Sequence, residues 1–130
     1  MSTRGFTLIE LMVTIAIVAI LAAIAAPNIG DQLQNYRVKS AAKNLVTDLN
    51  EARADAMTNR NTKTITVPAT TGDITWSRSP SGNLPESIAF DSEGSASFDA
   101  GGTRVVYEAS LNGKTAKVVA YRMRRAELWR

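Results

Sequence analysis

The chain has 130 residues, 45% of them hydrophobic and 21% charged, and this length favours a single domain. Its formal net charge of +3 is local, because residues 112–130 hold six basic side chains and one acid. It contains no cysteine and no histidine, which excludes disulfides and removes the commonest general base and metal ligand, so we expect no enzyme, no cofactor and no metal site.

The first element predicted along the chain is an apolar helix over residues 8–26, in which Glu10 and Thr14 are the clearly polar members. Nineteen helical residues measure about 28 Å, close to the thickness of the hydrocarbon layer of a bilayer. A buried core helix explains this segment poorly, because the rest of the chain is too small to surround a helix that is apolar on every side. A secretory signal cleaved near Ala23-Ile24-Ala25 and a membrane anchor both stay open.

Glu10 is the unusual residue of this segment, because a carboxylate inside a bilayer costs about 2.5 to 3.5 kcal/mol and requires a partner. No Lys, Arg or His lies between Leu8 and Ala26. We therefore expect the partner to be Arg4, a terminal amine or another chain.

The residues around Glu10 form a specific motif. They read Arg4-Gly5-Phe6-Thr7-Leu8-Ile9-Glu10-Leu11 and precede an apolar segment with a proline at its end. This motif closely resembles the signature of type IV pilins and pseudopilins. The resemblance implies that a prepilin peptidase cuts after Gly5, that the new Phe6 amine is methylated, and that Glu10 meets the Phe6 amine of a neighbouring subunit. Such a pair in a low-dielectric layer is favourable only when assembly brings both charges together.

The resemblance also implies a location and a set of partners. Residues 1–5 are then a cleaved leader, and residues 6–27 form a helix that crosses the bacterial inner membrane once, with the head in the periplasm. The partners are the prepilin peptidase, the lipid bilayer, other pilin or pseudopilin subunits and an inner-membrane assembly platform. After assembly the chain lies in a pilus or pseudopilus filament.

The same helix is predicted to continue over residues 28–61 with one apolar face. Its apolar positions recur mostly at spacings of three and four, and they are Ile29, Leu33, Tyr36, Ala42, Leu45, Leu49, Ala52 and Ala56. Pro27 and Gly30 are expected to kink or loosen the helix, because proline removes a helical hydrogen bond. We expect the helix to end at residues 59–61. An α+β pilin fold follows from the resemblance, with a long helix packed through its second half on a small antiparallel sheet.

The sequence at the end of this helix points to one group within the type IV pilins and pseudopilins. Residues 49–57 read LNEARADAM and lead into a strand, which resembles FimT/GspH-type minor pilins and pseudopilins, where an Ala-Arg-x-x-Ala helix end precedes the first strand. The missing cysteines remove a C-terminal disulfide loop common in major pilins, which also favours a minor pilin or pseudopilin. For the individual positions, we expect Ala52 and Ala56 to allow close packing and Arg53 and Arg60 to be solvated.

Residues 62–121 are predicted to form the antiparallel β head. Short strands are expected at 64–67, 74–77 and 88–90, with turns between them. The acids of this region are expected to be solvated turn residues, because the spacing of Asp91, Glu93 and Asp99 does not match a calcium-binding EF-hand loop.

The clearest element of the head is a hairpin over residues 103–123, because Asn112-Gly113 is the preferred two-residue turn. That loop length fixes the register. The predicted pairs are Val105 with Ala120, Tyr107 with Val118 and Ala109 with Ala116 on the helix-facing side, and Glu108 with Lys117 and Val106 with Val119 on the other. The strand is expected to leave the sheet near Tyr121, because its continued alternation would bury Arg122 and Arg124.

Residues 122–130 are then predicted to be an exposed basic tail. The tail resembles, imperfectly, the C-terminal Gly-Arg-x-Arg element of FimT-type minor pilins, which is reported to bind DNA in natural transformation; Tyr121 stands where that element has glycine, so Arg122 and Arg124 match. The candidate DNA-binding residues are Lys114, Lys117, Arg122, Arg124, Arg125 and Trp129.

Two interpretations of the chain stay open. One is a minor pilin or pseudopilin that contacts DNA without sequence preference. The other is a purely structural subunit, either a pseudopilin of a type II secretion system or a short major pilin, in which the basic tail aids solubility or guards a sheet edge.

Overall fold

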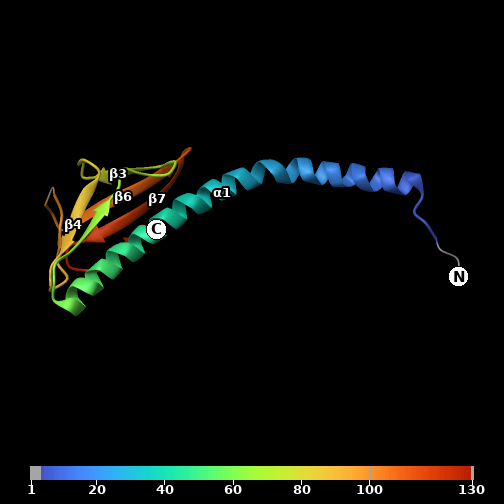
Figure 1. Cartoon of the computed structure of the whole chain (residues 1–130). Coiled ribbons are helices and arrows are strands. Elements are labelled where there is room, and N and C mark those ends of the chain that lie inside the picture. Colours follow the sequence, from blue (N-terminus) through green and yellow to red (C-terminus); the bar gives the residue numbers. More distant parts are fainter. Residues whose placement is uncertain (1–3, 100, 130) are drawn as a thin grey trace. The chain divides into compact units, whose positions relative to one another are not determined.

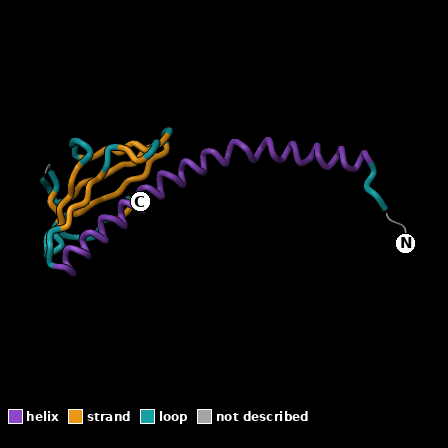
Figure 2. The backbone as a smooth tube through the Cα atoms, in the orientation of Figure 1, coloured by secondary structure: helices purple, strands orange, loops and turns teal. Residues whose placement is uncertain are grey.

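The computed structural model describes residues 4–99 and 101–129, so residues 1–3 of the predicted leader and the last residue of the predicted tail lie outside the described residues. Within them, one helix is followed by eight strands (Figures 1 and 2). The elements are α1 (Leu8–Asn59), β1 (Lys63–Val67), β2 (Thr70–Thr71), β3 (Ile74–Ser79), β4 (Glu86–Phe90), β5 (Ala96–Ser97), β6 (Arg104–Leu111), β7 (Lys114–Tyr121) and β8 (Glu127–Leu128). The chain forms two compact units that divide between Leu33 and Gln34, so α1 contributes to both. The predicted α+β fold, a long apolar N-terminal helix with antiparallel sheets, is confirmed.

The C-terminal end of α1 is closed by a backbone motif. Arg60 adopts a left-handed conformation with φ of 49°, and the Asn61 N–H donates to the carbonyl of Ala56 at 3.1 Å. This is the hydrogen bond of a Schellman cap, which satisfies a carbonyl that the helix leaves open. The predicted end of the helix at residues 59–61 is therefore confirmed.

The strands form two antiparallel sheets. One has the order β1-β4-β5 and the other the order β2-β3-β6-β7-β8. The hairpin of β6 and β7 has the predicted register in every pair, from Val105 opposite Ala120 to Leu111 opposite Lys114. Asn112 and Gly113 have φ of 48° and 79°, as a type I′ turn requires at both central positions. The turn residues therefore set which side chains share a face.

The core of the second unit lies between α1 and the sheets. The predicted hairpin face is buried, with Val105, Tyr107 and Ala109 fully enclosed. The helix contributes Val38, Ala42, Leu45, Leu49, Ala52 and Ala56 to the same cluster. The predicted apolar face of the helix was too long, because its buried positions begin at Val38 while Ile29, Leu33 and Tyr36 are exposed.

The predicted exposed tail is wrong for its first residue, Arg122, which is half-buried, and for its middle part. Residues Glu127–Leu128 form β8, which pairs with β7 through Val118 opposite Leu128 and Val119 opposite Glu127. Ala126 is buried, and both its backbone groups bond to the side chain of Asn50 on α1. The chain thus leaves β7 at Tyr121, as predicted, but returns to the sheet because α1 and β7 both offer it hydrogen bonds.

A buried ion pair lies inside the head. The Arg78 Nε atom is 2.6 Å from Glu86 Oε2, and both side chains are almost completely enclosed. The Glu86 carboxylate also accepts hydrogen bonds from the Tyr107 hydroxyl at 2.7 Å and the Asp99 N–H at 3.0 Å. A buried carboxylate is tolerated when paired and hydrogen-bonded in this way. This group ties β3, β4 and β6 together across the two sheets.

Candidate assembly segment and basic surface

The residues around Gly5 and Phe6 are exposed and lack packing contacts with other described residues at the Gly5 position. Residues 4–7 precede the helix and are exposed, and Phe6 is 90% exposed. A Cβ atom added at Gly5 would meet nothing within 4 Å, and Gly5 is not among the glycines with positive φ. Packing and backbone conformation in this structure therefore do not require glycine at position 5.

The helix start is organised by Thr7 and Glu10. The Glu10 carboxylate accepts from the Thr7 N–H at 2.9 Å and the Thr7 hydroxyl at 3.1 Å, while the Glu10 N–H donates to Thr7 Oγ1 at 3.3 Å. This reciprocal arrangement is a capping box. The expectation that the partner must be Arg4, an amine or another chain was incomplete, because it considered charged partners alone. The spacing Thr7-x-x-Glu10 is the sequence signal that identifies the local partner.

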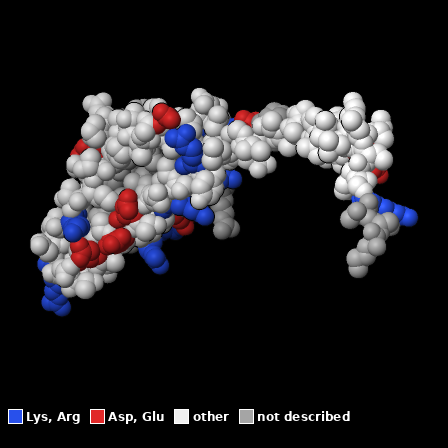
Figure 3. Space-filling model, turned by 45° about the vertical axis from the view of Figure 1, so that its right-hand side comes forward, with Lys and Arg blue, Asp and Glu red and all other residues white. Residues whose placement is uncertain are grey.

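The apolar part of α1 presents hydrophobic side chains to its surroundings on every side. Its large side chains are all more than half exposed, and they are Leu8, Ile9, Leu11, Met12, Val13, Ile15, Ile17, Val18, Ile20, Leu21 and Ile24. The segment is long and apolar enough to cross a membrane, with none of it buried. Figure 3 shows it as an almost uninterrupted surface without charge. An apolar surface of this extent marks a membrane or protein contact.

The predicted weak point of the helix lies at Pro27 and Gly30. The helix continues through both positions, since α1 runs unbroken from Leu8 to Asn59. A Cβ atom at Gly30 would also meet nothing within 4 Å. The kink therefore stays a prediction.

The predicted basic residues are only partly available to a ligand. Lys117 Nζ lies 3.4 Å from Glu108, as the hairpin register predicts, and Arg124 lies 2.7 Å from Glu127. The Arg124 guanidinium also stacks on Tyr121 at 4.1 Å from the ring centre. Lys114 is half-buried at the start of β7, while Arg125 is exposed. The predicted residues thus do not form one uniform patch.

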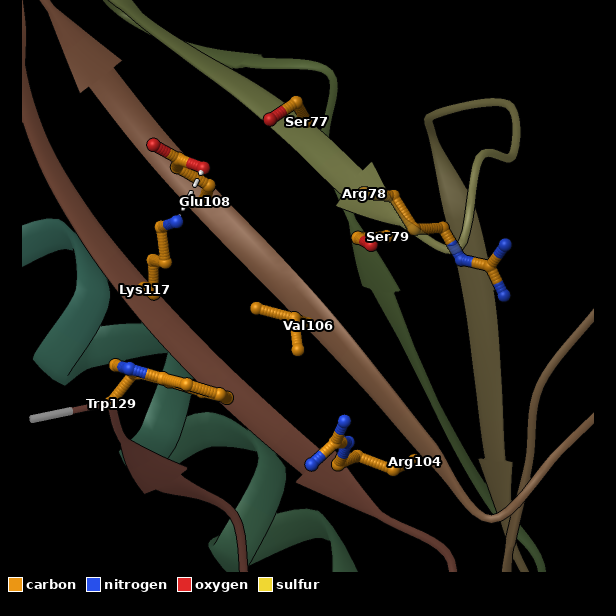
Figure 4. A pocket seen from close by; sticks show the side chains of 8 residues that line it. All are labelled: Ser77, Arg78, Ser79, Arg104, Val106, Glu108, Lys117 and Trp129. Carbon is orange, nitrogen blue, oxygen red and sulfur yellow. Dashed lines mark ion pairs between the residues drawn. The ribbon is translucent and has the colours of Figure 1, made fainter.

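Trp129 lies beside the outer face of the sheet. Its backbone N–H donates to the Lys117 carbonyl at 2.9 Å, and the residue is 53% exposed. The Arg104 guanidinium lies 5.9 Å from the ring centre. These side chains line a groove of about 330 Å³ together with Ser77, Arg78, Ser79, Val106, Glu108 and Lys117 (Figure 4). In Figure 4 Arg78 points away from the groove. Its guanidinium is paired with the buried carboxylate of Glu86.

Comparisons with known proteins match the N-terminal segment of the chain. The family model for the prokaryotic N-terminal methylation motif matches residues 1–26. The N-terminal segment of the chain is thus similar to that of proteins that carry this methylation motif. Three curated relatives, all type IV major fimbrial proteins FimA of Dichelobacter nodosus, are each 46% identical over 50 residues, which is 38% of this chain. The chain spans 29–30% of the length of these relatives. No solved structure matches the chain.

Sequence-based prediction misplaced one arginine of the head and did not include another. Arg53 was expected to be solvated, but it is 8% exposed, donates to the Tyr121 carbonyl and stacks on Phe90 at 5.2 Å from the ring centre. Burial lowers the pKa of the Arg53 guanidinium. Arg104 was not considered, although the predicted register already places it opposite Tyr121. Continuing the predicted hairpin register by one pair beyond Val105 and Ala120 identifies Arg104 as a neighbour of the tail.

Proposed function

We propose that the chain is a minor pilin or pseudopilin subunit that is cleaved after Gly5 and methylated at Phe6. The observation that carries this proposal is the exposed apolar segment of α1 directly after an exposed Gly5-Phe6 step. A protease has access to this step, and a methyl transfer to the Phe6 amine needs the same access. Since neither local packing nor backbone conformation explains Gly5, a requirement of the prepilin peptidase is the better explanation.

Glu10 is proposed to support assembly. In the uncut chain its carboxylate is held by Thr7 and stays exposed. The positively charged Phe6 amine of a neighbouring subunit can then pair with the Glu10 carboxylate, which Thr7 already orients. In the low-dielectric interior of a filament, this pair favours association over separate subunits.

Before assembly, the apolar helix is proposed to cross the bacterial inner membrane once, with the head in the periplasm. The lipid bilayer then covers the exposed apolar surface, which neighbouring pilin or pseudopilin subunits cover in the filament. The transfer between these surroundings is assigned to an inner-membrane assembly platform.

We further propose that the head contacts DNA through its C-terminal arginines. Arg122 and Arg125 support this role, since neither has an ion-pair partner among the described residues, and Trp129 supplies an exposed ring. The side chains suit phosphates rather than base edges, so binding is weak, salt-dependent and indifferent to sequence.

A purely structural subunit is the second candidate, either a pseudopilin of a type II secretion system or a short major pilin. Two observations favour it. The curated relatives are described as major fimbrial proteins, and Lys117 and Arg124 are engaged in ion pairs within the head.

Mass spectrometry of the mature protein tests the common part of both candidates. We expect the N-terminus to be a methylated Phe6. A mature chain that keeps Met1, or that starts near Ala26, would overturn the proposal. A Gly5→Leu variant should accumulate uncut, while Gly30→Leu, a glycine that also has open space around it, should be cut normally.

A further inference from the structure

A cavity of about 530 Å³ lies where β6 begins and β7 ends. It is lined by Thr103, Arg104, Tyr121, Arg122, Met123 and Arg124. Three of these residues are arginines, and none of the described residues that line the cavity is acidic. Arg124 is paired with Glu127, so the guanidinium groups of Arg104 and Arg122 are the ones that favour an anionic ligand.

Arg122 is fixed at this cavity by its backbone. Its N–H donates to the Thr103 carbonyl and its own carbonyl accepts from the Ala96 N–H, at 2.9 and 2.8 Å. Its side-chain Nε is buried and has no hydrogen-bond partner within residues 4–99 and 101–129. An unsatisfied buried donor is costly, so contacts within the described residues do not explain the position of the Arg122 side chain.

Arg104 connects this cavity to the Trp129 groove. It lines both, because the register places it opposite Tyr121 while its guanidinium reaches toward the Trp129 ring (Figure 4). The acid that lines the groove, Glu108, is already paired with Lys117. An anionic group in the cavity and a flat ring on Trp129 would therefore lie on either side of one arginine.

We propose that the arginine cavity and the Trp129 groove together bind single-stranded nucleic acid. A backbone phosphate occupies the cavity, and the adjacent unpaired base stacks on Trp129. This inference rests on the proposed DNA role and adds the kind of strand that is bound. A duplex offers phosphates to the cavity, but its bases are paired and stacked on each other, so they cannot use the ring.

The test uses the full chain in a neutral detergent and three fluorescent probes of equal length. These are an oligothymidine, an abasic strand with the same sugar-phosphate backbone, and a duplex. Fluorescence anisotropy should show the oligothymidine binding about fivefold or more tightly than the abasic strand, which is the gain expected from one stacked base. The duplex should bind no better than the abasic strand.

Variants separate the base contact from the phosphate contact. Trp129→Leu should abolish the advantage of the oligothymidine and leave the abasic strand unaffected, while Trp129→Phe should retain part of it. Arg104→Gln and Arg122→Gln should weaken the binding of both the oligothymidine and the abasic strand. Each variant should reduce the slope of log affinity against log salt by about 0.7. Arg60→Gln is the matched control, because Arg60 is exposed and lines neither the arginine cavity nor the Trp129 groove. This variant should change the affinity for each probe little.

Tryptophan fluorescence gives an independent measurement. The chain has two tryptophans, and Trp76 is buried with its indole N–H bonded to Thr71 at 3.0 Å. Quenching by the oligothymidine should therefore come from Trp129 and be lost in Trp129→Phe.

Three outcomes would overturn the inference. If the oligothymidine and the duplex bind equally and Trp129→Leu has no effect, the single-strand site is wrong while the DNA role survives. If none of the nucleic acids binds at low salt, the proposed DNA role fails with it. If phosphatidylglycerol vesicles bind in an Arg104- and Arg122-dependent way and the oligothymidine does not, the cavity binds lipid headgroups instead.

Discussion

The side-chain amide of Asn50 holds the backbone of Ala126 on both sides. Asn50 Oδ1 accepts from the Ala126 N–H at 2.8 Å, and Asn50 Nδ2 donates to the Ala126 carbonyl at 3.0 Å. The two residues are 76 positions apart in sequence. This contact fixes the chain between β7 and β8, and it thereby determines where Trp129 lies.

Replacing Asn50 with alanine should destabilise the head and release β8. The buried backbone of Ala126 loses two partners, which costs about 1 to 3 kcal/mol of unfolding free energy. Hydrogen exchange at the Trp129 amide should become faster, since that amide bonds to Lys117 only while β8 is docked. Asn44→Ala is the control, because Asn44 lies on the same helix and is exposed, and an unchanged Trp129 amide in Asn50→Ala would contradict the expectation.

The hairpin was predictable from sequence, but β8 was not. Asn112-Gly113 dictates the register of the strands on either side, since a two-residue turn leaves no freedom in the pairing. A two-residue strand such as Glu127–Leu128 carries no periodicity, and its position depends on Asn50, a residue of the distant helix. The local sequence pattern therefore predicts the hairpin, whereas the position of β8 depends on its contacts with residues that are distant in sequence.

The same distinction explains the candidate site. Gly5, Phe6 and Glu10 lie within one short motif, so the sequence alone predicts them as candidate site residues. The pair of Arg78 and Glu86 is not predictable from local sequence, because the two residues lie on strands of different sheets and a charged residue in a short strand is ordinarily solvated. The burial of Arg53 likewise follows from contact with β4 and the end of β7, which no local pattern shows.

Tyr107 should make the head sensitive to high pH. Burial and the adjacent Glu86 carboxylate raise the pKa of the Tyr107 phenol above its ordinary value of 10.0, while Arg78 opposes this shift. The unfolded chain then loses the proton before the folded chain does. The stabilisation is fully present below pH 10.0 and declines as the pH rises further.

Unfolding free energies measured from neutral pH upward should show this decline in the original chain and a flatter profile in Tyr107→Phe. Below pH 10.0 the variant should also be less stable than the original chain by about 1 to 3 kcal/mol, because one hydrogen bond to buried Glu86 is removed. Tyr36→Phe changes an exposed tyrosine and should retain the original profile. Parallel profiles for the original chain and Tyr107→Phe would refute this explanation.

Duplex DNA should bind to the head through Arg122 more than through Arg124. The Arg124 guanidinium forms an ion pair with Glu127 and stacks on Tyr121, whereas the side chain of Arg122 retains an Nε without a hydrogen-bond partner among the described residues. Arg122→Gln should therefore lower the slope of log affinity against log salt by about 0.9, and Arg124→Gln by less. Equal affinities for the original chain and an Arg122→Gln, Arg124→Gln double variant would remove the DNA role and leave the structural subunit.

Glu10→Gln should separate the two roles of this residue. Glutamine retains the acceptor that the Thr7 N–H needs, so the capping box and the start of α1 should persist. It removes the negative charge, so the amine of a neighbouring Phe6 no longer finds a counter-ion. In cells that assemble the filament, cleavage should stay normal while the amount of this subunit in sheared filaments falls strongly.

Thr7→Ala is the complementary variant, since it keeps the Glu10 charge and removes the Thr7 hydroxyl. Its helix start should weaken by about 1 kcal/mol, as is typical for the loss of a capping side chain, and hydrogen exchange at Leu8 and Ile9 should become faster. The subunit should still enter filaments, because the charge pair between chains is intact. If Thr7→Ala failed to assemble while Glu10→Gln assembled normally, then assembly would depend on the helix start and not on the charge of Glu10.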